Sequence, residues 1–226
     1  MISIAIDGYS GSGKGELCKG LSEKFGLKHL DTGAILRAIG LYFYKKGIEQ
    51  ITGDILKNNI DNIDINIEFE AGTQKTFLNN QDVSSEIRQE IIGQMASRVA
   101  PFVEAMQKMI DISQNFAKKY DCVLDGRNIT SAVLPDADVK FFLTADVEIR
   151  AKRRFDESIK KGQNVSYNEI LDSLKERDWR DTHRDFTPMI QTDDSIYVDN
   201  SDMSISETVM FCTQKASEIL RQKGKI

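Results

Sequence analysis

The amino-acid sequence predicts an α/β fold in which a parallel five-stranded sheet lies between two layers of helices. Five short apolar runs alternate along the chain with segments whose hydrophobic residues recur at helical spacing, which is the order of repeated βαβ units. Four of the five runs are followed directly by an aspartate, as expected where a buried strand leads into a loop. The runs cover residues 2–6, 28–30, 122–124, 139–143 and 196–198.

Helical spacing of apolar residues predicts the helices between these strands. The pattern over residues 17–25 ends at Gly26, and the next ends at Gly47, since glycine commonly closes a helix. The predicted helices cover residues 17–25, 34–46, 83–119 with an interruption near Pro101, 147–159 and 167–184.

Residues 51–78 have a different character. Ile63, Ile65 and Ile67 alternate with polar residues, which is typical of a strand with one exposed face. The apolar pair 77–78 precedes two asparagines, which indicates a partner strand and a turn. We expect an antiparallel insertion here within a single domain of residues 1–226.

Length and composition exclude several classes of protein. A chain of 226 residues with 40% apolar and 29% charged side chains is expected to form a soluble globular domain. The net charge of −5 disfavours nucleic-acid binding, and no apolar run is long enough to span a membrane. The first residues lack the basic region of a signal peptide. Three widely spaced cysteines are not expected to form a disulfide framework or a zinc site, so we expect a cytoplasmic protein.

A glycine-rich loop follows the first predicted strand and precedes the first predicted helix, which is the context of a phosphate-binding Walker A loop. Glycines let successive backbone N–H groups turn toward phosphate oxygens, and the helix N-terminus adds partial positive charge. The lysine at the end of the loop would reach the β- and γ-phosphates as a point charge. The loop consists of Gly8, Tyr9, Ser10, Gly11, Ser12, Gly13 and Lys14.

The position after the loop lysine is Gly15, where a serine or threonine hydroxyl usually contacts magnesium. Mg²⁺ would therefore be held by phosphates and water, with a carboxylate behind the water and no direct protein ligand. Asp125, at the end of the third core strand, is the candidate for that carboxylate. The alternative is that Asp125 is only a turn residue at a strand end.

Basic residues are concentrated in the second half of an acidic chain. Seven of the eleven arginines fall between residues 127 and 184. One shared helix face is predicted by a spacing of i, i+3, i+4 and i+7, at which stand Arg177, Arg180, Asp181 and Arg184. Such a stripe is either a solvated, salt-bridged face or an anion-binding surface.

The sequence resembles the bacterial cytidylate kinases, nucleoside monophosphate kinases of the P-loop class, in blocks that run in the family's order from residue 2 to about residue 207. The insertion after the second helix is typical of this group and not of adenylate kinases. The blocks are the loop at 8–15, Leu30-Asp31-Thr32-Gly33, residues 78–83 with 86–88, Leu124-Asp125-Gly126-Arg127, residues 134–138, 150–154 and 175–184.

The resemblance implies a three-layer P-loop kinase with a nucleoside-monophosphate-binding insertion at residues 51–100 and a lid at residues 153–176. The implied reaction transfers phosphate from MgATP to CMP or dCMP in a monomeric enzyme. Residues 8–16, ending with Gly15 and Glu16, would bind ATP. The implied catalytic residues are Lys14, Asp125, Arg127, Arg177 and Arg184. The implied acceptor-binding residues are Thr32, Arg37, Ser97, Arg127, Asn128, Arg177, Asp181 and Arg184.

Some residues depart from the family pattern. Glu16 replaces a threonine beside the α-phosphate, and Asn128 replaces an aspartate. No arginine occurs near Met106, where a base-reading arginine is expected; Lys108 is the nearest substitute. These changes leave open a kinase that prefers another base, such as UMP or AMP.

Loss of the Gly15 hydroxyl and gain of Glu16 leave open a non-catalytic nucleotide-binding regulator. Three further arginines, Arg150, Arg153 and Arg154, would either close over ATP as part of the lid or lie on a solvated surface.

Overall fold

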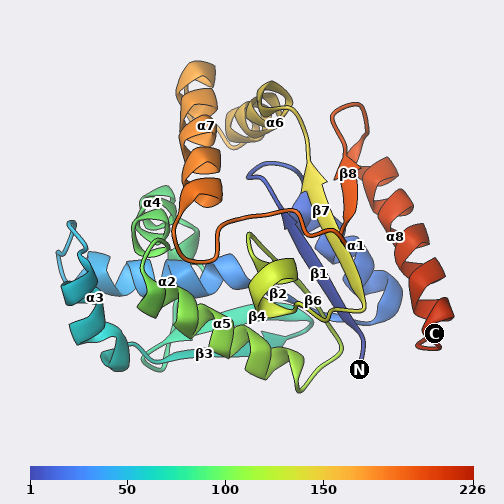
Figure 1. The fold of residues 1–226 in the computed structure, drawn as a ribbon. Helices are drawn as coiled ribbons and strands as arrows, with labels where there is room; N and C mark the ends of the chain where they lie inside the picture. Colours follow the sequence, from blue (N-terminus) through green and yellow to red (C-terminus); the bar gives the residue numbers. More distant parts are fainter. The chain divides into compact units, whose positions relative to one another are not determined.

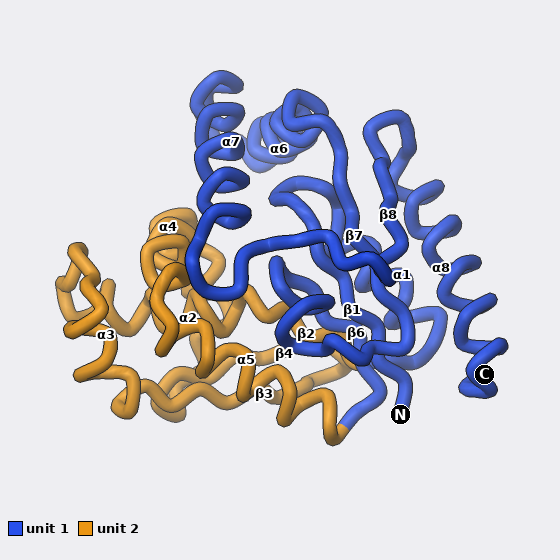
Figure 2. Tube along the Cα trace, in the orientation of Figure 1, with its two compact units in different colours: residues 1–27, 120–226 blue, residues 28–119 orange.

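The structure is a computed structural model that describes residues 1–226. The chain forms two compact units (Figure 2). The first consists of residues 1–27 and 120–226, and the second of residues 28–119. The second unit covers more of the chain than the insertion expected at residues 51–100.

A five-stranded sheet confirms the predicted fold class, with the strand order β2–β6–β1–β7–β8. Strand β1 is central and pairs in parallel with β6 and β7, and β7 pairs in parallel with β8. All five apolar runs of the sequence form strands. Their bounds are β1 Ser3–Gly8, β2 Lys28–Asp31, β6 Cys122–Gly126, β7 Val139–Thr144 and β8 Ile196–Asp199.

Helices α1 (Lys14–Phe25) and α8 (Ile205–Gln222) pack together on one face of this sheet (Figure 1). Ile4 and Ile6 of β1 contribute to the apolar core beneath them, together with Leu17 and Leu21 of α1. The side chain of Asp7 points to the opposite face because neighbouring residues of a strand alternate. There it accepts hydrogen bonds from a short π-helix, Ile129–Val133.

Helices α6 (Val147–Lys160) and α7 (Tyr167–His183) lie side by side (Figure 1). A short turn that contains Gly162, with φ of +72°, connects them. The region expected to form a lid, residues 153–176, covers most of α6, this turn and the first half of α7. The sequence pattern predicted both helices to within one residue at each end.

The second unit combines helices with a three-stranded antiparallel sheet of order β3–β4–β5. The paired strands β3 and β4 confirm the antiparallel character expected of the insertion. Asn79 and Asn80 both have positive φ, at 49° and 66°, and form the predicted turn. The elements are α2 Thr32–Lys45, α3 Gly53–Asn59, η1 Ile60–Asn62, β3 Ile65–Glu70, β4 Thr73–Leu78, β5 Gln81–Asp82, η2 Glu86–Arg88, α4 Glu90–Val99 and α5 Val103–Ala117.

Two features of the chain bear on the excluded classes. None of the helices is both long enough and apolar enough to cross a lipid bilayer. Cys18, Cys122 and Cys212 are buried, and none of them is in a disulfide bond.

Candidate active site

The glycine-rich loop connects the central strand β1 to α1, as the sequence predicted. Gly8 has a φ of +146°, and a Cβ atom at this position would lie 1.9 Å from the carbonyl oxygen of Leu143. Only glycine fits there. Gly13 begins α1 in a left-handed conformation, and no side chain caps the helix. The first N–H groups of α1 and its positive dipole end therefore suit a phosphate ligand.

Lys14 is buried at the end of the loop. Its Nζ donates hydrogen bonds to the carbonyl oxygens of Gly8 and Tyr9, at 2.9 and 2.8 Å. Burial and, second to it, the positive charge of Arg127 lower the pKa of Lys14 to about 7, against the opposing charge of Asp125. The ammonium group thus lies in a site where an anion would stabilise its charged form.

Asp125 lies at the carboxyl end of β6, beside the start of the glycine-rich loop. Its Cα is paired with that of Ile6 on the neighbouring strand β1. The partly buried carboxylate offers the hard oxygen donors that Mg²⁺ prefers, and its charge acts on Lys14. This donor chemistry fits a role for Asp125 behind a magnesium-bound water.

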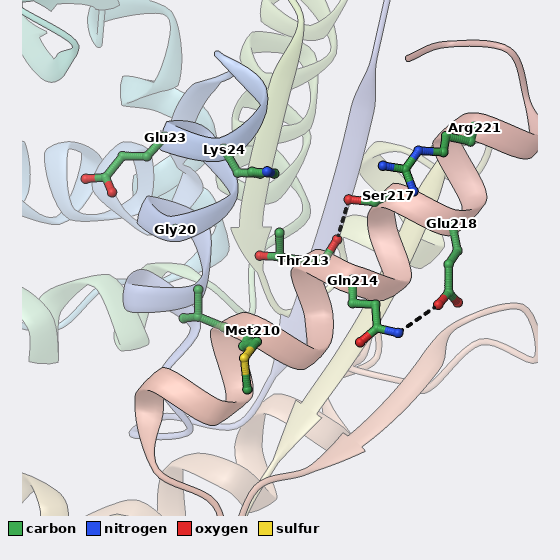
Figure 3. A pocket seen from close by; sticks show the side chains of 10 residues that line it. Gly20, Glu23, Lys24, Met210, Thr213, Gln214, Ser217, Glu218 and Arg221 are labelled. Atoms are coloured by element: carbon green, nitrogen blue, oxygen red, sulfur yellow. Dashed lines mark hydrogen bonds between the residues drawn. The ribbon is translucent and has the colours of Figure 1, made fainter.

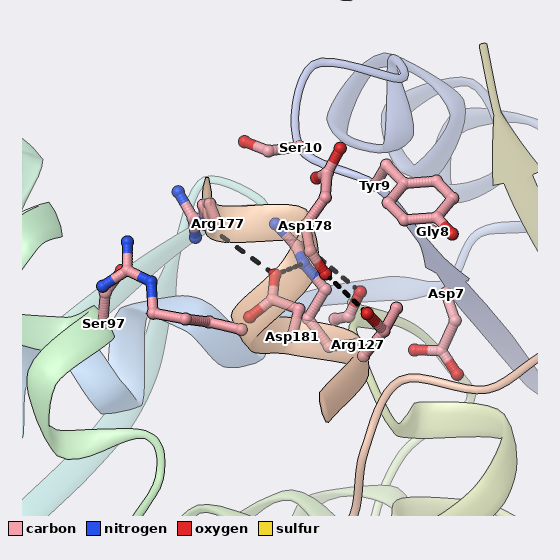
Figure 4. A network of polar contacts seen from close by, with 12 residues as sticks. Asp7, Gly8, Tyr9, Ser10, Ser97, Arg127, Arg177, Asp178 and Asp181 are labelled. Atoms are coloured by element: carbon pink, nitrogen blue, oxygen red, sulfur yellow. Dashed lines mark hydrogen bonds and ion pairs between the residues drawn. The ribbon is translucent and has the colours of Figure 1, made fainter. Parts of the chain in front are cut away.

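Arg127 and Arg177 meet around the carboxylate of Asp181 (Figure 4). Nε of Arg127 donates to Oδ2 of Asp181 at 2.7 Å, and Nε of Arg177 lies 3.9 Å from the same oxygen. Burial alone would raise the pKa of Asp181, but the two arginines hold it below its usual value. The carboxylate therefore stays ionised, fixes the guanidinium group of Arg127 by a hydrogen bond and attracts that of Arg177.

Arg184 follows the last residue of helix α7, and its charge acts on Asp181 of that helix. Helix α7 ends at His183, and Arg184 has extended backbone angles, with ψ of 146°. The chain then folds back, and the N–H of Met189 donates to the carbonyl oxygen of Asp181 at 2.7 Å. This bond satisfies a carbonyl group that the end of the helix leaves without an intrahelical partner.

The guanidinium group of Arg184 is placed to bind an anion. Its Nε donates to the carbonyl oxygen of Thr187 at 2.7 Å, while its Nη2 is buried without a hydrogen-bond partner. Burial lowers the pKa of Arg184, and the charge of Asp181 opposes this shift. A buried guanidinium N–H without an acceptor is costly, and a phosphate oxygen would satisfy it.

Asn128 is buried next to Arg127 and its Nδ2 lies 3.1 Å from Oγ1 of Thr187, to which it donates. Asn128 and Arg184 thus both contact Thr187, whose φ of +46° is unusual for a β-branched residue. The structure brings Asn128, Arg184 and Thr187 together.

The remaining candidates belong to the second unit. Thr32 is the first residue of α2 and is buried, but the helix is capped by Asp31, whose carboxylate accepts from the N–H of Ala34. Asp31 also binds Nη2 of Arg37 at 2.5 Å and Nη1 of Arg88 at 3.0 Å. Nε of Arg37 is buried without a partner, which again suits an anionic ligand.

Ser97 and Lys108 bond to backbone groups of the second unit. Oγ of Ser97 donates to the carbonyl oxygen of Gly93 in the same helix, at 3.2 Å. Nζ of Lys108 donates to the carbonyl oxygen of Ile60 at 3.1 Å, and Met106 is buried. Lys108 is thus held by the backbone of η1.

Sequence analysis missed the role of Asp7. This fully buried carboxylate accepts from the N–H of Ile129, the N–H of Thr130 and the hydroxyl of Thr130, at 2.8, 2.8 and 2.6 Å. Burial raises the pKa of Asp7, and these hydrogen bonds oppose the shift. Asp7 joins the strand before the glycine-rich loop to the segment after Arg127. The signal in the sequence was an aspartate at the end of an apolar strand, directly before the loop.

The alternative of a solvated surface is wrong for Arg150, which is only 4% exposed. Its guanidinium contacts the backbone of the glycine-rich loop. Arg153 also bonds to backbone carbonyl oxygens, those of Asn200 and Met203. Arg154 is exposed, as a surface position would be.

An open groove between α1 and α8 lies on the helical face of the sheet (Figure 3). Gly20 and Lys24 of α1 line one side, and Met210 and Arg221 of α8 line the other. It includes none of the predicted nucleotide-binding residues.

Comparisons with known proteins identify related sequences. The family model described as cytidylate kinase matches residues 4–218. A cytidylate kinase of Caldicellulosiruptor saccharolyticus is 41% identical over 208 residues, which are 92% of each chain. A cytidylate kinase of Phocaeicola vulgatus is 39% identical over 219 residues, covering 95% of this chain and 96% of its own.

A solved structure supports the fold alone. An uncharacterised protein of Eubacterium ventriosum superposes with a TM-score of 0.52 at 15% identity, over 96% of this chain and 99% of that one. Family membership rests on the sequence matches, which span nearly the whole chain. The chain belongs to the cytidylate kinase family.

Proposed function

We propose that this protein transfers the γ-phosphate of ATP to CMP or dCMP, with release of ADP and the nucleoside diphosphate. One observation carries the proposal most directly. The buried Lys14 of the phosphate loop lies in the same compact unit as the cluster of Arg127, Arg177 and Asp181. A loop for a polyphosphate and a set of fixed guanidinium groups are what transfer between two anions requires.

The loop would hold the donor. Its backbone N–H groups and the N-terminus of α1 bind phosphate oxygens, and Lys14 exchanges its two carbonyl acceptors for the β- and γ-phosphates. Excluding water from this buried lysine strengthens its attraction to the transferred group. Mg²⁺ bound with ATP would supply further neutralisation of phosphate charge, and Asp125 would hold one of its waters.

Arginines would hold the acceptor phosphate. Asp181 orients Arg127 and Arg177, and Asp31 orients Arg37, so that these side chains lose little conformational freedom when the substrate binds. Two anionic groups repel each other, and guanidinium forks offset that repulsion. Their charge also stabilises a loose transition state, so the reaction needs no covalent intermediate.

A second candidate function is a nucleoside monophosphate kinase of altered base preference. Two observations favour it: Asn128 donates to Thr187, and Lys108 is bound to the carbonyl oxygen of Ile60. An amide at position 128 both donates and accepts, unlike a carboxylate, so it would read a cytosine edge differently.

A panel of monophosphates tests these alternatives. ADP release is measured with ATP and each of CMP, dCMP, UMP and AMP. Turnover confined to CMP and dCMP supports the proposal, and faster turnover of UMP or AMP supports altered base preference. Nucleotide binding without any turnover would support a non-catalytic regulator. Light scattering after gel filtration would test the expected monomer.

A further inference from the structure

Arg150 of α6 makes three different polar contacts with one buried guanidinium group. Nε donates to the carbonyl oxygen of Ala145 at 2.8 Å, and Nη1 donates to the carbonyl oxygen of Ser10 at 3.1 Å. Nη2 lies 2.7 Å from Oδ2 of Asp178 on α7. The guanidinium carbon also lies 5.0 Å from the centre of the Tyr9 ring. A solvent-facing lid residue would not have this set of partners.

The contact with Ser10 bears directly on the phosphate loop. In a planar trans peptide the C=O of one residue and the N–H of the next point in opposite directions. Holding the Ser10 carbonyl toward α6 therefore directs the N–H of Gly11 away from α6. The two segments are in close contact, since a Cβ atom on Gly11 would lie 3.2 Å from Cβ of Arg150.

A second carbonyl of the loop is held in the same way. Nδ2 of the buried Asn200 donates to the carbonyl oxygen of Ser12 at 2.9 Å, which directs the N–H of Gly13 away from Asn200. Asn200 is itself held by Arg153, the second arginine of α6. Side chains outside the loop thus fix two of its peptide planes.

The ion pair with Asp178 connects Arg150 to the helix that carries the proposed acceptor-binding residues. Figure 4 shows Asp178 beside Arg177 and Asp181. Asp178 follows Arg177 in α7 and stands one turn before Asp181 and Thr182. An ion pair between a buried guanidinium and a partly buried carboxylate keeps this part of α7 at a fixed distance from the loop.

We propose that Arg150 is a positioning residue that sets the conformation of the donor-phosphate loop and couples it to the helix carrying Arg177 and Asp181. The acceptor half of this inference rests on the proposed function. The donor half requires only that the loop binds a nucleoside triphosphate. Neither half needs Arg150 to contact a nucleotide.

The test compares Arg150→Lys with Arg154→Lys, an exposed position on the same helix. Lysine keeps the charge but cannot make three divergent contacts. Calorimetry measures the dissociation constant of a non-hydrolysable ATP analogue with Mg²⁺, and steady-state kinetics measure kcat and the KM for CMP. We expect Arg150→Lys to weaken analogue binding about 10-fold and to raise the KM for CMP, because preorganisation of both sites is lost. Arg154→Lys should stay within about twofold of the wild type.

A second variant keeps the inference falsifiable if Arg150→Lys does not fold. Asp178→Asn removes the ion pair without touching the loop, and it should weaken analogue binding about threefold or more. The double variant should bind no more weakly than Arg150→Lys, since both changes break one connection.

Three results would overturn the inference. The first is wild-type analogue binding in Arg150→Lys, and the second is wild-type binding in Asp178→Asn. The third is a fall in kcat with unchanged binding, which would make Arg150 a direct ligand of the transferred phosphate. Failure of wild-type CMP turnover would instead refute the proposed function, and the analogue measurements would still decide the donor half.

Discussion

The lowered pKa of Lys14 predicts that the binding of ATP is coupled to proton uptake. In the nucleotide-free protein, burial and the nearby Arg127 lower the pKa of Lys14 to about 7. A bound polyphosphate places opposite charge beside Nζ and raises that pKa again. Lys14 should therefore gain a proton when ATP binds at a pH above 7.

The number of protons taken up equals the fraction of Lys14 that is neutral before ATP binds. At pH 8 a group with a pKa near 7 is roughly 90% neutral, so binding should take up about 0.9 proton, whereas at pH 6 it should take up about 0.1. Calorimetric titration with an ATP analogue, in buffers of different ionisation enthalpy, gives this number as the slope of the observed enthalpy.

Two variants test whether Lys14 is the group that takes up the proton. Lys14→Met should remove the uptake at pH 8, and Lys19→Met, at an exposed position of α1, should leave it unchanged. Absence of uptake in the wild-type protein at pH 8 would refute this reasoning. So would equal uptake in Lys14→Met, because the proton would then belong to the ligand or to another residue.

The lowered pKa of Lys14 also affects the free energy of unfolding of the nucleotide-free protein. Because the folded-state pKa of Lys14 is lowered from 10.5 to about 7, the unfolded chain binds more protons between these values. The contribution of Lys14 to the free energy of unfolding therefore rises as pH increases from about 7 to about 10.5. The difference in melting temperature between wild type and Lys14→Met should change with pH in that direction, and a difference that does not depend on pH would contradict it.

Three other predictions follow from individual residues. Glu16→Thr should tighten ATP binding by up to about fivefold, since an exposed carboxylate in the first turn of α1 repels a polyphosphate; an unchanged KM for ATP would count against that geometry. Thr130→Val should lower the free energy of unfolding by about 1–3 kcal/mol in denaturant titrations, because Asp7 loses a buried donor, whereas Thr130→Ser should retain most of it. Asn128→Asp should increase the ratio of CMP to UMP turnover, and a lower ratio would show that Asn128 does not read the base.

The periodic parts of the fold could be predicted from the sequence. Strand β7 and helices α1 and α6 have regular apolar spacing, and their predicted bounds lie close to the observed ones. Helix α8 was not predicted, although Ser204 and Glu207 form a capping box at its start. The π-helix after Asn128 was also missed, because the carboxylate of Asp7, far away in the sequence, holds its first N–H groups.

The part of the site that is contiguous in the sequence could be predicted. The glycine-rich loop could be recognised from the pattern of its own residues, so residues 8–14 were assigned to phosphate binding without tertiary information. The end of α7 before Arg184 could not be predicted, because helical spacing does not show the turn in which Met189 bonds to Asp181. Arg150 could not be assigned because its partners Ser10 and Asp178 lie 140 and 28 positions away, and only folding brings them together.

Transfer of labelled phosphate tests the central claim most directly. The protein is incubated with Mg²⁺, CMP and ATP labelled at the γ-phosphate, and the products are separated. The proposed function predicts that the label appears in the β-phosphate of CDP, and that Lys14→Met largely abolishes its transfer. Label found only in inorganic phosphate, or remaining in ATP, would contradict the proposal.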